Sequence, residues 1–217
     1  NKTINPKSLV SCLNYIWISD NESMFKGCYK LPPAHYISYN KTTGLKLVKY
    51  WELQDNTGNK TSSNIDSIAA DVADTMESSV KRHMVADVPV SCFLSGGLDS
   101  SLISVLAKKS NDHLSTYTIG TDDKDKKAES MPDDEKYANM LAGLFNLDHN
   151  VIKISPDILK DLPAMVKSLD EPIGDPAAIN TYLICKAARD KGVKVLLSGM
   201  GADEIFFGYR RQKATMM

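Results

Sequence analysis

The sequence lacks the marks of a membrane, secreted or nucleic-acid-binding protein. No apolar run approaches the length that crosses a bilayer, and the N-terminus does not resemble a signal peptide. Lysine and arginine form no dense block and the net charge is -1 at pH 7, which disfavours nucleic acid and anionic membranes as main partners. Apolar residues make up 42% of the chain, enough for a substantial core. We therefore expect a globular cytoplasmic protein that acts on small molecules.

Cysteine is scarce, and histidine forms no metal-binding pattern. The 4 cysteines are widely spaced without a Cys-x-x-Cys pair, and the 4 histidines share no metal-ligand spacing. Cys92 and Cys185 lie in apolar stretches of sequence. We expect both to be reduced core residues, which fits a reducing cytoplasm.

The chain divides near residues 54–64, a polar, turn-rich stretch with the composition of a linker. Before it, residues 34–39 and 45–51 alternate in polarity around a glycine-containing turn, which predicts a β-hairpin. After it, strands and helices alternate along the sequence. We expect strands at 88–94, 114–120, 149–154 and 193–197, and helices at 65–84, 102–107, 134–147, 156–169 and 178–191. This order predicts an α/β fold with a doubly wound parallel sheet and ligands at the carboxyl ends of the strands.

The most informative segment is Ser95–Ser101, Ser-Gly-Gly-Leu-Asp-Ser-Ser, between an expected strand and an expected helix. Its glycines let backbone N–H groups approach a ligand closely, its serines add hydroxyl groups, and the helix dipole favours negative charge. The segment lacks the Gly-Lys-Ser/Thr ending of a Walker A loop. It therefore predicts a phosphate site of another kind.

A second segment of this type is Ser198–Glu204, which also follows an apolar strand and combines small residues with acids. Two loops at the carboxyl ends of parallel strands are expected to face one crevice. Asp99 and Asp203 are then candidate ligands for Mg²⁺, which takes one or two carboxylates in addition to phosphate oxygens.

The two loops together resemble the synthetase domain of the glutamine-dependent asparagine synthetases, a family of pyrophosphate-loop ATP enzymes with an adenine nucleotide α-hydrolase-like fold. Three further stretches agree with the resemblance: residues 24–35, Tyr50-Trp51 and Asp170–Pro176. The resemblance implies that residues 1–53 are the tail of a β-rich glutaminase domain and its junction. Residues 64–217 would be the ATP-binding synthetase domain, truncated at its C-terminus.

The resemblance also implies roles for individual residues. Pyrophosphate and Mg²⁺ would be bound by the first loop, through Ser95, Gly96, Gly97, Asp99, Ser100 and Ser101. Leu94 and Ile119 would line the adenosine pocket, and Ser198 and Gly199 would contact the nucleotide. Asp203 would be the second metal carboxylate, so that Asp99 and Asp203 are the expected catalytic and metal-binding pair.

The implied reaction is synthesis of asparagine. The side-chain carboxylate of aspartate attacks the α-phosphorus of ATP, giving β-aspartyl-AMP and pyrophosphate, and ammonia derived from glutamine then displaces AMP. The implied cofactors are ATP and Mg²⁺. The glutaminase domain of the same parent chain would supply the ammonia, and a homodimer is compatible with the resemblance.

The chain differs from the family pattern at several points. Met200 stands where many members have an acid, and Phe207 where a small residue is usual. The N-terminal cysteine nucleophile and the C-terminal helical part with its lysine are absent from the sequence, so we expect a fragment that binds ATP without completing the synthesis. Met200 keeps open a related ligase that adenylates another carboxylate, such as a β-lactam-forming synthetase or a sugar amidotransferase. A non-catalytic nucleotide-binding protein is a further alternative, whereas a tRNA-thiolating enzyme is disfavoured by the lack of paired cysteines.

Overall fold

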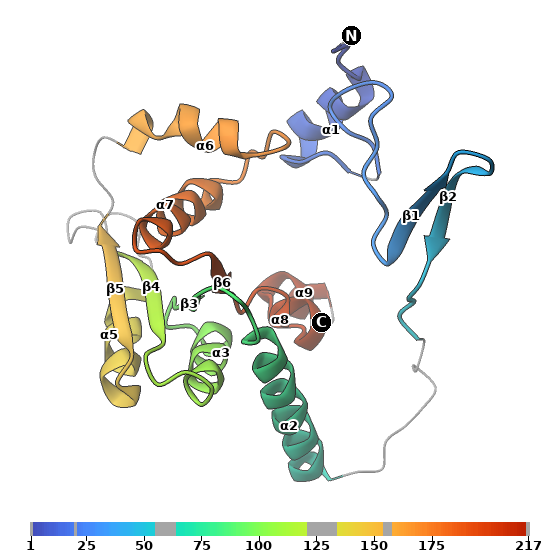
Figure 1. Ribbon diagram of the computed structural model, residues 1–217. Coiled ribbons are helices and arrows are strands. Elements are labelled where there is room, and N and C mark those ends of the chain that lie inside the picture. Colours follow the sequence, from blue (N-terminus) through green and yellow to red (C-terminus); the bar gives the residue numbers. More distant parts are fainter. Residues whose placement is uncertain (1, 20, 55–63, 121–133, 154–157, 216–217) are drawn as a thin grey trace. The chain divides into compact units, whose positions relative to one another are not determined.

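A computed structural model describes residues 2–19, 21–54, 64–120, 134–153 and 158–215 (Figure 1). The chain forms two compact units, Asn1–Ser63 with Leu162–Ala178, and Asn64–Asp161 with Ile179–Met217. Residues 162–178, which we expected within the ATP-binding domain, thus cluster with the first unit. Most of the expected linker lies outside the described residues. None of the helices in the described ranges has the length and apolar character needed to cross a membrane.

The second unit contains a parallel sheet with a reversal in its strand order. Its described strands are β3 (Val90–Phe93), β4 (Ser115–Gly120), β5 (Asp148–Lys153) and β6 (Val195–Leu197), in the spatial order β5-β4-β3-β6. The chain moves outward from β3 through β4 to β5 and then returns to place β6 on the other side of β3. In doubly wound sheets, the crevice at such a reversal is where ligands bind.

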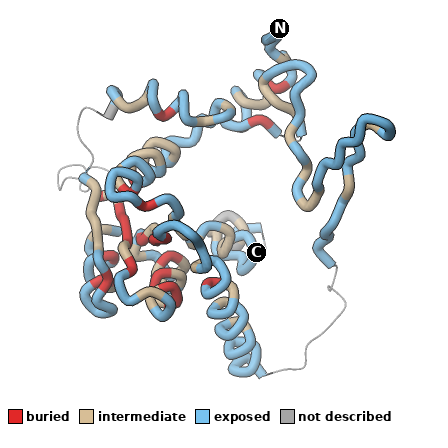
Figure 2. Tube along the Cα trace, viewed as in Figure 1, coloured by how far each residue is buried: buried red, intermediate tan, exposed pale blue. Residues whose placement is uncertain are grey.

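One face of this sheet is covered by α2 (Ile65–His83), α3 (Leu98–Lys108) and α5 (Asp134–Phe145). Cys92 and Leu94, two residues apart on and after β3, point to the same face and are completely buried in this core. Burial of such a leucine stabilises the fold by about 1.5–3 kcal/mol. Figure 2 shows the buried positions gathered in this unit, along the strands and the sides of the helices that face them.

The opposite face is covered by α7 (Ala177–Asp190), whose Ile184 and Ala188 pack with Tyr117 of β4. Phe93, which lies between Cys92 and Leu94, also packs against this second core. Helices therefore lie on both faces of the sheet, and the predicted α/β, doubly wound parallel fold is confirmed.

The first unit combines α1 (Pro6–Tyr15), the antiparallel hairpin of β1 (His35–Asn40) and β2 (Gly44–Lys49), and α6 (Leu162–Ser168). The hairpin matches its prediction. We had not anticipated α1, although Asn5 and the following proline form a recognisable helix start, with the Asn5 side chain accepting a hydrogen bond from the backbone N–H of Lys7.

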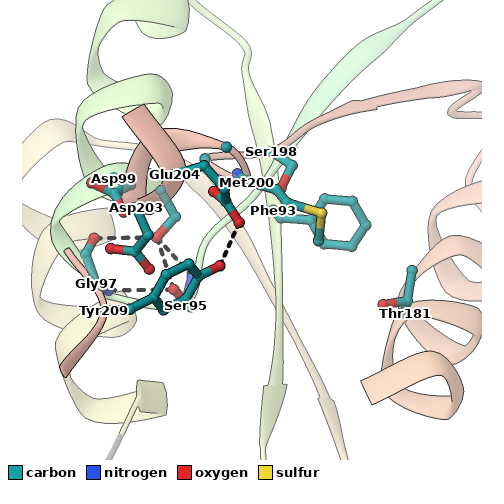
Figure 3. Close-up of a pocket in the computed structure, with 13 residues that line it drawn as sticks. Phe93, Ser95, Gly97, Asp99, Thr181, Ser198, Met200, Asp203, Glu204 and Tyr209 are labelled. Atoms are coloured by element: carbon teal, nitrogen blue, oxygen red, sulfur yellow. Dashed lines mark hydrogen bonds between the residues drawn. The ribbon is translucent and has the colours of Figure 1, made fainter. Parts of the chain in front are cut away.

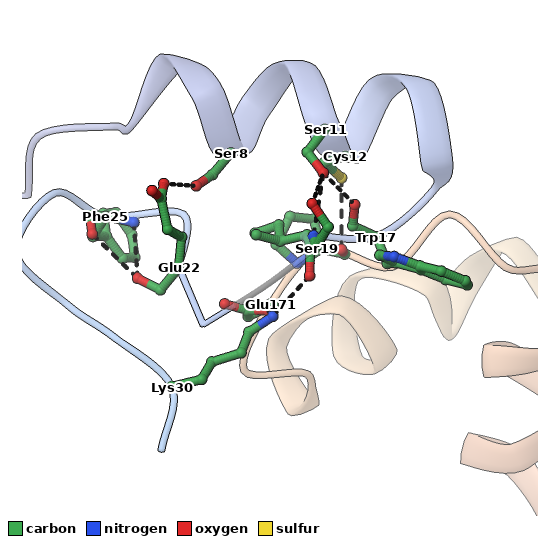
Figure 4. Close-up of polar contacts among 12 residues, drawn as sticks. Ser8, Ser11, Cys12, Trp17, Ser19, Glu22, Phe25, Lys30 and Glu171 are labelled. Atoms are coloured by element: carbon green, nitrogen blue, oxygen red, sulfur yellow. Dashed lines mark hydrogen bonds and ion pairs between the residues drawn. The ribbon is translucent and has the colours of Figure 1, made fainter. Parts of the chain in front are cut away.

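Polar contacts tie the two segments of the first unit together (Figure 4). The Gly174 amide donates to the Ile16 carbonyl over 2.8 Å, and Lys30 forms a 2.8 Å ion pair with Glu171. Near α1, hydrogen bonds from Asn5 and Lys7 to Glu22 lower the pKa of the Glu22 carboxyl.

Two sequence predictions need correction. The helix expected over 156–169 is interrupted in its described part, where a 3₁₀ turn at Ile158–Lys160 is followed by α6. Pro163 explains the break, because proline has no N–H to donate to the Leu159 carbonyl in a continuous helix, whereas it is tolerated in the first turn of α6. Cys92 is buried as expected, but Cys185 is exposed. The buried face of α7 is set by Ile184 and Ala188, and Cys185 lies beside that face.

The buried environment of His149 predicts how the stability of the second unit depends on pH. Its Nδ1 atom lies 2.8 Å from Oγ1 of Thr116, and its buried Nε2 atom has no hydrogen-bond partner among the described residues. Burial lowers the pKa of His149, while the charges of Glu135 and Asp148 oppose the shift. The unfolded chain therefore binds a proton more readily than the folded chain. We expect neutral His149 to make its full contribution to the free energy of unfolding above about pH 6.5, the ordinary histidine pKa. This contribution should be lost as the pH falls below that value.

Urea unfolding of the full chain between pH 5 and 8 measures this effect. The His149→Gln variant should lose less stability than the unsubstituted protein between pH 7 and pH 5. The matched variant His113→Gln, at an exposed position, should retain the original dependence. Equal pH dependence in all three proteins would contradict the prediction.

Candidate functional site

A pocket of about 410 Å³ opens in the second unit at the reversal between β3 and β6 (Figure 3). Its lining comes from the end of β3, the two predicted loops, the helices that follow them, the turn after α8, and one position of α7. The lining residues are Phe93, Ser95, Gly97, Asp99, Ser100, Thr181, Ser198, Gly199, Met200, Gly201, Asp203, Glu204 and Tyr209.

The first loop is closed by the hydroxyl group of Ser100. This oxygen accepts from the Ser95 amide over 3.2 Å, lies 2.9 Å from Oγ of Ser95, and donates to the Gly97 carbonyl over 3.2 Å. Gly97 is the N-cap of α3 and supplies no side-chain hydrogen bond to the helix. The first turn of α3 is thus left without a side-chain cap, as an anion-binding helix start requires.

Gly96 fits the loop against α5. Its φ is +75°, and a β-carbon there would lie 2.7 Å from Cβ of Tyr137 and 2.8 Å from the amide nitrogen of Ala138. Both its backbone conformation and its surroundings therefore require glycine. Gly96 does not line the pocket, so the structure gives it a packing role.

The second loop joins β6 to α8 (Ala202–Phe206) and touches the first loop directly. A β-carbon on Gly199 would lie 2.8 Å from the carbonyl carbon of Asp99 and 2.8 Å from the amide nitrogen of Ser100. The Ser198 hydroxyl accepts from the Met200 amide over 3.1 Å and holds the turn. The two loops, far apart in sequence, therefore form one continuous wall.

Acidic groups dominate one side of the pocket. Asp99 lies in the first turn of α3 and Asp203 in the first turn of α8. Neither side chain has a hydrogen-bond or ion-pair partner among the residues that the structure describes. The Tyr209 hydroxyl donates to Oε1 of Glu204 over 2.5 Å. No lysine, arginine or histidine occurs among the described residues that line the pocket.

The carboxylates of this pocket suit a hard cation that takes its remaining ligands from a bound phosphate compound. The carboxylates of Asp99 and Asp203 are the oxygen donors that Mg²⁺ prefers, and Mg²⁺ commonly takes only one or two protein carboxylates. No group of three His, Cys, Asp or Glu side chains that could hold a metal occurs within the described part of the chain. The residues present therefore fit a metal whose remaining ligands come from phosphate and water.

The predicted site residues fall into two groups in the structure. The pocket brings together Ser95, Gly97, Asp99, Ser100, Ser198, Gly199 and Asp203. The other predicted residues, Leu94, Gly96, Ser101 and Ile119, are not among its lining residues. The Leu94 side chain is fully buried beneath the helices, and Ile119 packs in the α7 core.

Some lining residues were not predicted. Phe93 precedes the first loop on the last position of β3, and strand alternation turns it away from Leu94 toward the α7 face. Thr181 comes from α7, which is expected to cover a face of the sheet and carries no sequence signal for this pocket.

The fold and the site together define a doubly wound α/β protein with a pocket at its strand reversal. Residues 71–217 match the family model described as asparagine synthase, and the chain belongs to that family.

Among curated relatives, the chain is 41% identical over 145 residues to asparagine synthetase [glutamine-hydrolyzing] 1 of Bacillus subtilis, covering 66% of this chain and 22% of the relative. It is 33% identical over 196 residues to asparagine synthetase [glutamine-hydrolyzing] 3 of the same organism, covering 86% and 31%. The chain thus spans less than a third of the length of these relatives. A solved structure of NH3-dependent NAD synthetase from Campylobacter jejuni is similar with a TM-score of 0.40 and 19% identity, covering 68% of this chain and 61% of that chain.

Contact between the two loops can be tested with the Gly199→Ala variant. The added β-carbon would meet backbone atoms of Asp99 and Ser100, which cannot move aside without shifting α3. We expect the free energy of unfolding to fall by roughly 1–3 kcal/mol, as is usual for overpacking. Urea unfolding measures the change.

Gly143→Ala is the matched control, because a β-carbon at Gly143 meets nothing within 4 Å. Gly143 lies within α5, so alanine should stabilise the protein by up to about 1 kcal/mol. A Gly199→Ala protein as stable as the original would show that the loops do not touch.

Proposed function

We propose that this chain is the ATP-binding part of a ligase that forms asparagine. In this proposal ATP activates the side-chain carboxylate of aspartate as β-aspartyl-AMP, and ammonia derived from glutamine then displaces AMP. The main support is that two loops of the predicted type meet at the strand reversal and line one pocket with Asp99 and Asp203.

The pyrophosphate-loop assignment is supported by the arrangement of donors around the first loop. The start of α3 offers backbone N–H groups and the positive end of its dipole, with the Ser95 hydroxyl beside them. We propose that Ser95, Gly97 and Ser100 hold the phosphates that leave as pyrophosphate. Gly96 and Ser101 lie outside the pocket lining. Gly96 fits the loop against α5, and the Ser101 amide donates to the Gly97 carbonyl over 3.0 Å.

The charge of the pocket supports a requirement for Mg²⁺. ATP would bring a polyphosphate close to Asp99, Asp203 and Glu204, and like charges at short range repel each other. We propose that Asp99 and Asp203 hold Mg²⁺, which when bound neutralises phosphate charge and polarises the phosphorus–oxygen bonds.

The proposed chemistry needs positioning more than covalent participation by the protein. A carboxylate oxygen of aspartate forms a bond to the α-phosphorus while the bond to the bridging oxygen of pyrophosphate breaks. The nitrogen of ammonia then attacks the acyl carbon. AMP leaves, and the new amide nitrogen releases a proton. The protein would hold the reacting groups in line and stabilise charge on the phosphates.

For the nucleotide we propose contacts at the ends of β3, β4 and β6. Ser198 and Gly199 line the pocket directly. Because the Leu94 side chain is buried in the core, any contact of Leu94 with adenosine would use its backbone. Ile119 remains a proposed contact at the end of β4.

A second candidate function is adenylation of another carboxylic acid. It is favoured by Met200, which lines the pocket with 89% of its surface exposed. A thioether cannot form an ion pair with the ammonium group of an amino acid. The acceptor would then be an acid that presents an uncharged group at this position.

Further partners belong to the same proposal. We propose that residues 1–53 are the tail of a glutaminase domain of the same parent chain, and that this domain supplies the ammonia. We also propose a cytoplasmic location, which suits the free thiols of Cys12, Cys28, Cys92 and Cys185.

ATP–pyrophosphate exchange in the full-length protein tests the adenylation step, with aspartate and a panel of other carboxylic acids. Aspartate-dependent exchange that requires Mg²⁺ is the expected result. Exchange with a different acid alone would establish the second candidate. Absence of exchange despite binding of Mg·ATP would contradict both.

The metal role predicts that Asp203→Asn lowers the exchange rate by at least about tenfold, as is usual for a perturbed metal site. Asp87→Asn, at an exposed position outside the pocket, is the matched control and should leave the rate unchanged. Equal exchange rates in the two variants would show that Asp203 is not part of the metal site.

A further inference from the structure

The turn that follows α8 folds back on Asp203. The amides of Phe207 and Gly208 both donate to the Asp203 carbonyl, the latter over 3.1 Å. Phe207 has φ 56° and ψ 43°, a left-handed conformation that is uncommon outside glycine. Such a residue persists only where its surroundings enforce the conformation, and here the two amides on one carbonyl do so.

Gly208 leaves the space that the Asp203 carboxylate occupies. A β-carbon at Gly208 would overlap Oδ1 of Asp203 and lie 2.9 Å from its carboxyl carbon. The φ of Gly208 is not positive, so its backbone conformation does not call for glycine. The reason for glycine at this position is therefore contact with the carboxylate.

A side-chain hydrogen bond closes the same turn. The Tyr209 hydroxyl donates over 2.5 Å to Glu204, the residue next to Asp203 on α8. At its other end, the Tyr209 amide donates over 3.1 Å to Oε1 of Gln212, in the first turn of α9 (Arg210–Thr215). In Figure 3, Tyr209 and Glu204 lie beside Asp203 on the acidic side of the pocket. The turn is thus fixed on both sides of Gly208.

We propose that Gly208 and Tyr209 are positioning residues that fix the Asp203 carboxylate for Mg²⁺. Gly208 leaves free the space in which the Asp203 carboxylate lies, and Tyr209 keeps the backbone of Gly208 in place through Glu204. Neither residue needs to touch the metal or the phosphates. This inference rests on the proposed function, in which Asp203 binds Mg²⁺ in the presence of ATP.

The test measures binding of a fluorescent ATP analogue to the full-length protein while Mg²⁺ is titrated, with a parallel measurement in EDTA. In Gly208→Ala we expect the Mg²⁺ concentration for half-maximal binding to rise about 10- to 100-fold, the usual effect of disturbing the support of a metal ligand. Tyr209→Phe should raise it by roughly fivefold, as for loss of one hydrogen bond. Binding in EDTA should stay unchanged in Gly208→Ala, because Gly208 is not among the residues that line the pocket. The thermal midpoint of both variants is measured in parallel and reports any general loss of stability.

Two matched controls and one double variant separate positioning from a general structural effect. Gly143→Ala and Tyr39→Phe, outside the pocket, should leave the Mg²⁺ dependence unchanged. Gly208→Ala added to Asp203→Asn should cause no further loss, because both changes act through the same carboxylate.

The outcomes distinguish this inference from the proposed function. Normal Mg²⁺ dependence in Gly208→Ala, or losses that add to those of Asp203→Asn, would overturn the positioning role and leave the proposed function standing. If the unsubstituted protein binds the nucleotide without any dependence on Mg²⁺, the proposed metal role fails and the inference fails with it.

Discussion

The contact between the Gly199 backbone and the start of α3 is the constraint on which the site depends. It exists because β6 returns to lie beside β3, so that two loops distant in sequence leave the sheet side by side. Each loop alone is a strand-to-helix turn with small residues. Only their contact brings Asp99 and Asp203 into one pocket, and the absence of a side chain at residue 199 permits that contact.

The pocket combines opposing electrostatic features within a small volume. The uncapped start of α3 favours an anion, whereas the carboxylates of Asp99, Asp203 and Glu204 favour a cation. In the proposed complex, a phosphate and a divalent cation together would compensate both features, and either one alone would leave one of them uncompensated. Binding of the two is therefore expected to be mutually dependent, as linkage between neighbouring sites requires.

The sequence allowed prediction of the parallel sheet and of both loops, because apolar runs followed by small residues and acids are local signals. Alternation along a strand also implies that Leu94 shares a face with Cys92 and turns its side chain into the core, so its expected contact with adenosine remains a prediction for its backbone. The position of Thr181 at the pocket depends on how α7 crosses the far face of the sheet, and no local sequence pattern specifies that crossing. The fit of Gly208 to the Asp203 carboxylate was equally inaccessible, because it depends on the three-dimensional path of a turn rather than on residue type.

The discontinuous first unit has a consequence for folding during synthesis. Its second segment begins at Leu162, and its contacts include the hydrogen bond between Gly174 and Ile16 and the ion pair between Lys30 and Glu171. The ribosome must translate the first part of the second unit before this segment emerges, a delay of roughly 5–20 s at ordinary elongation rates. Throughout that interval the N-terminal segment lacks these contacts, and neither Ile16 nor Lys30 has its partner from the second segment. Nascent chains in which residues 162–178 have not yet emerged from the ribosome would thus have a less ordered N-terminal segment than the finished chain.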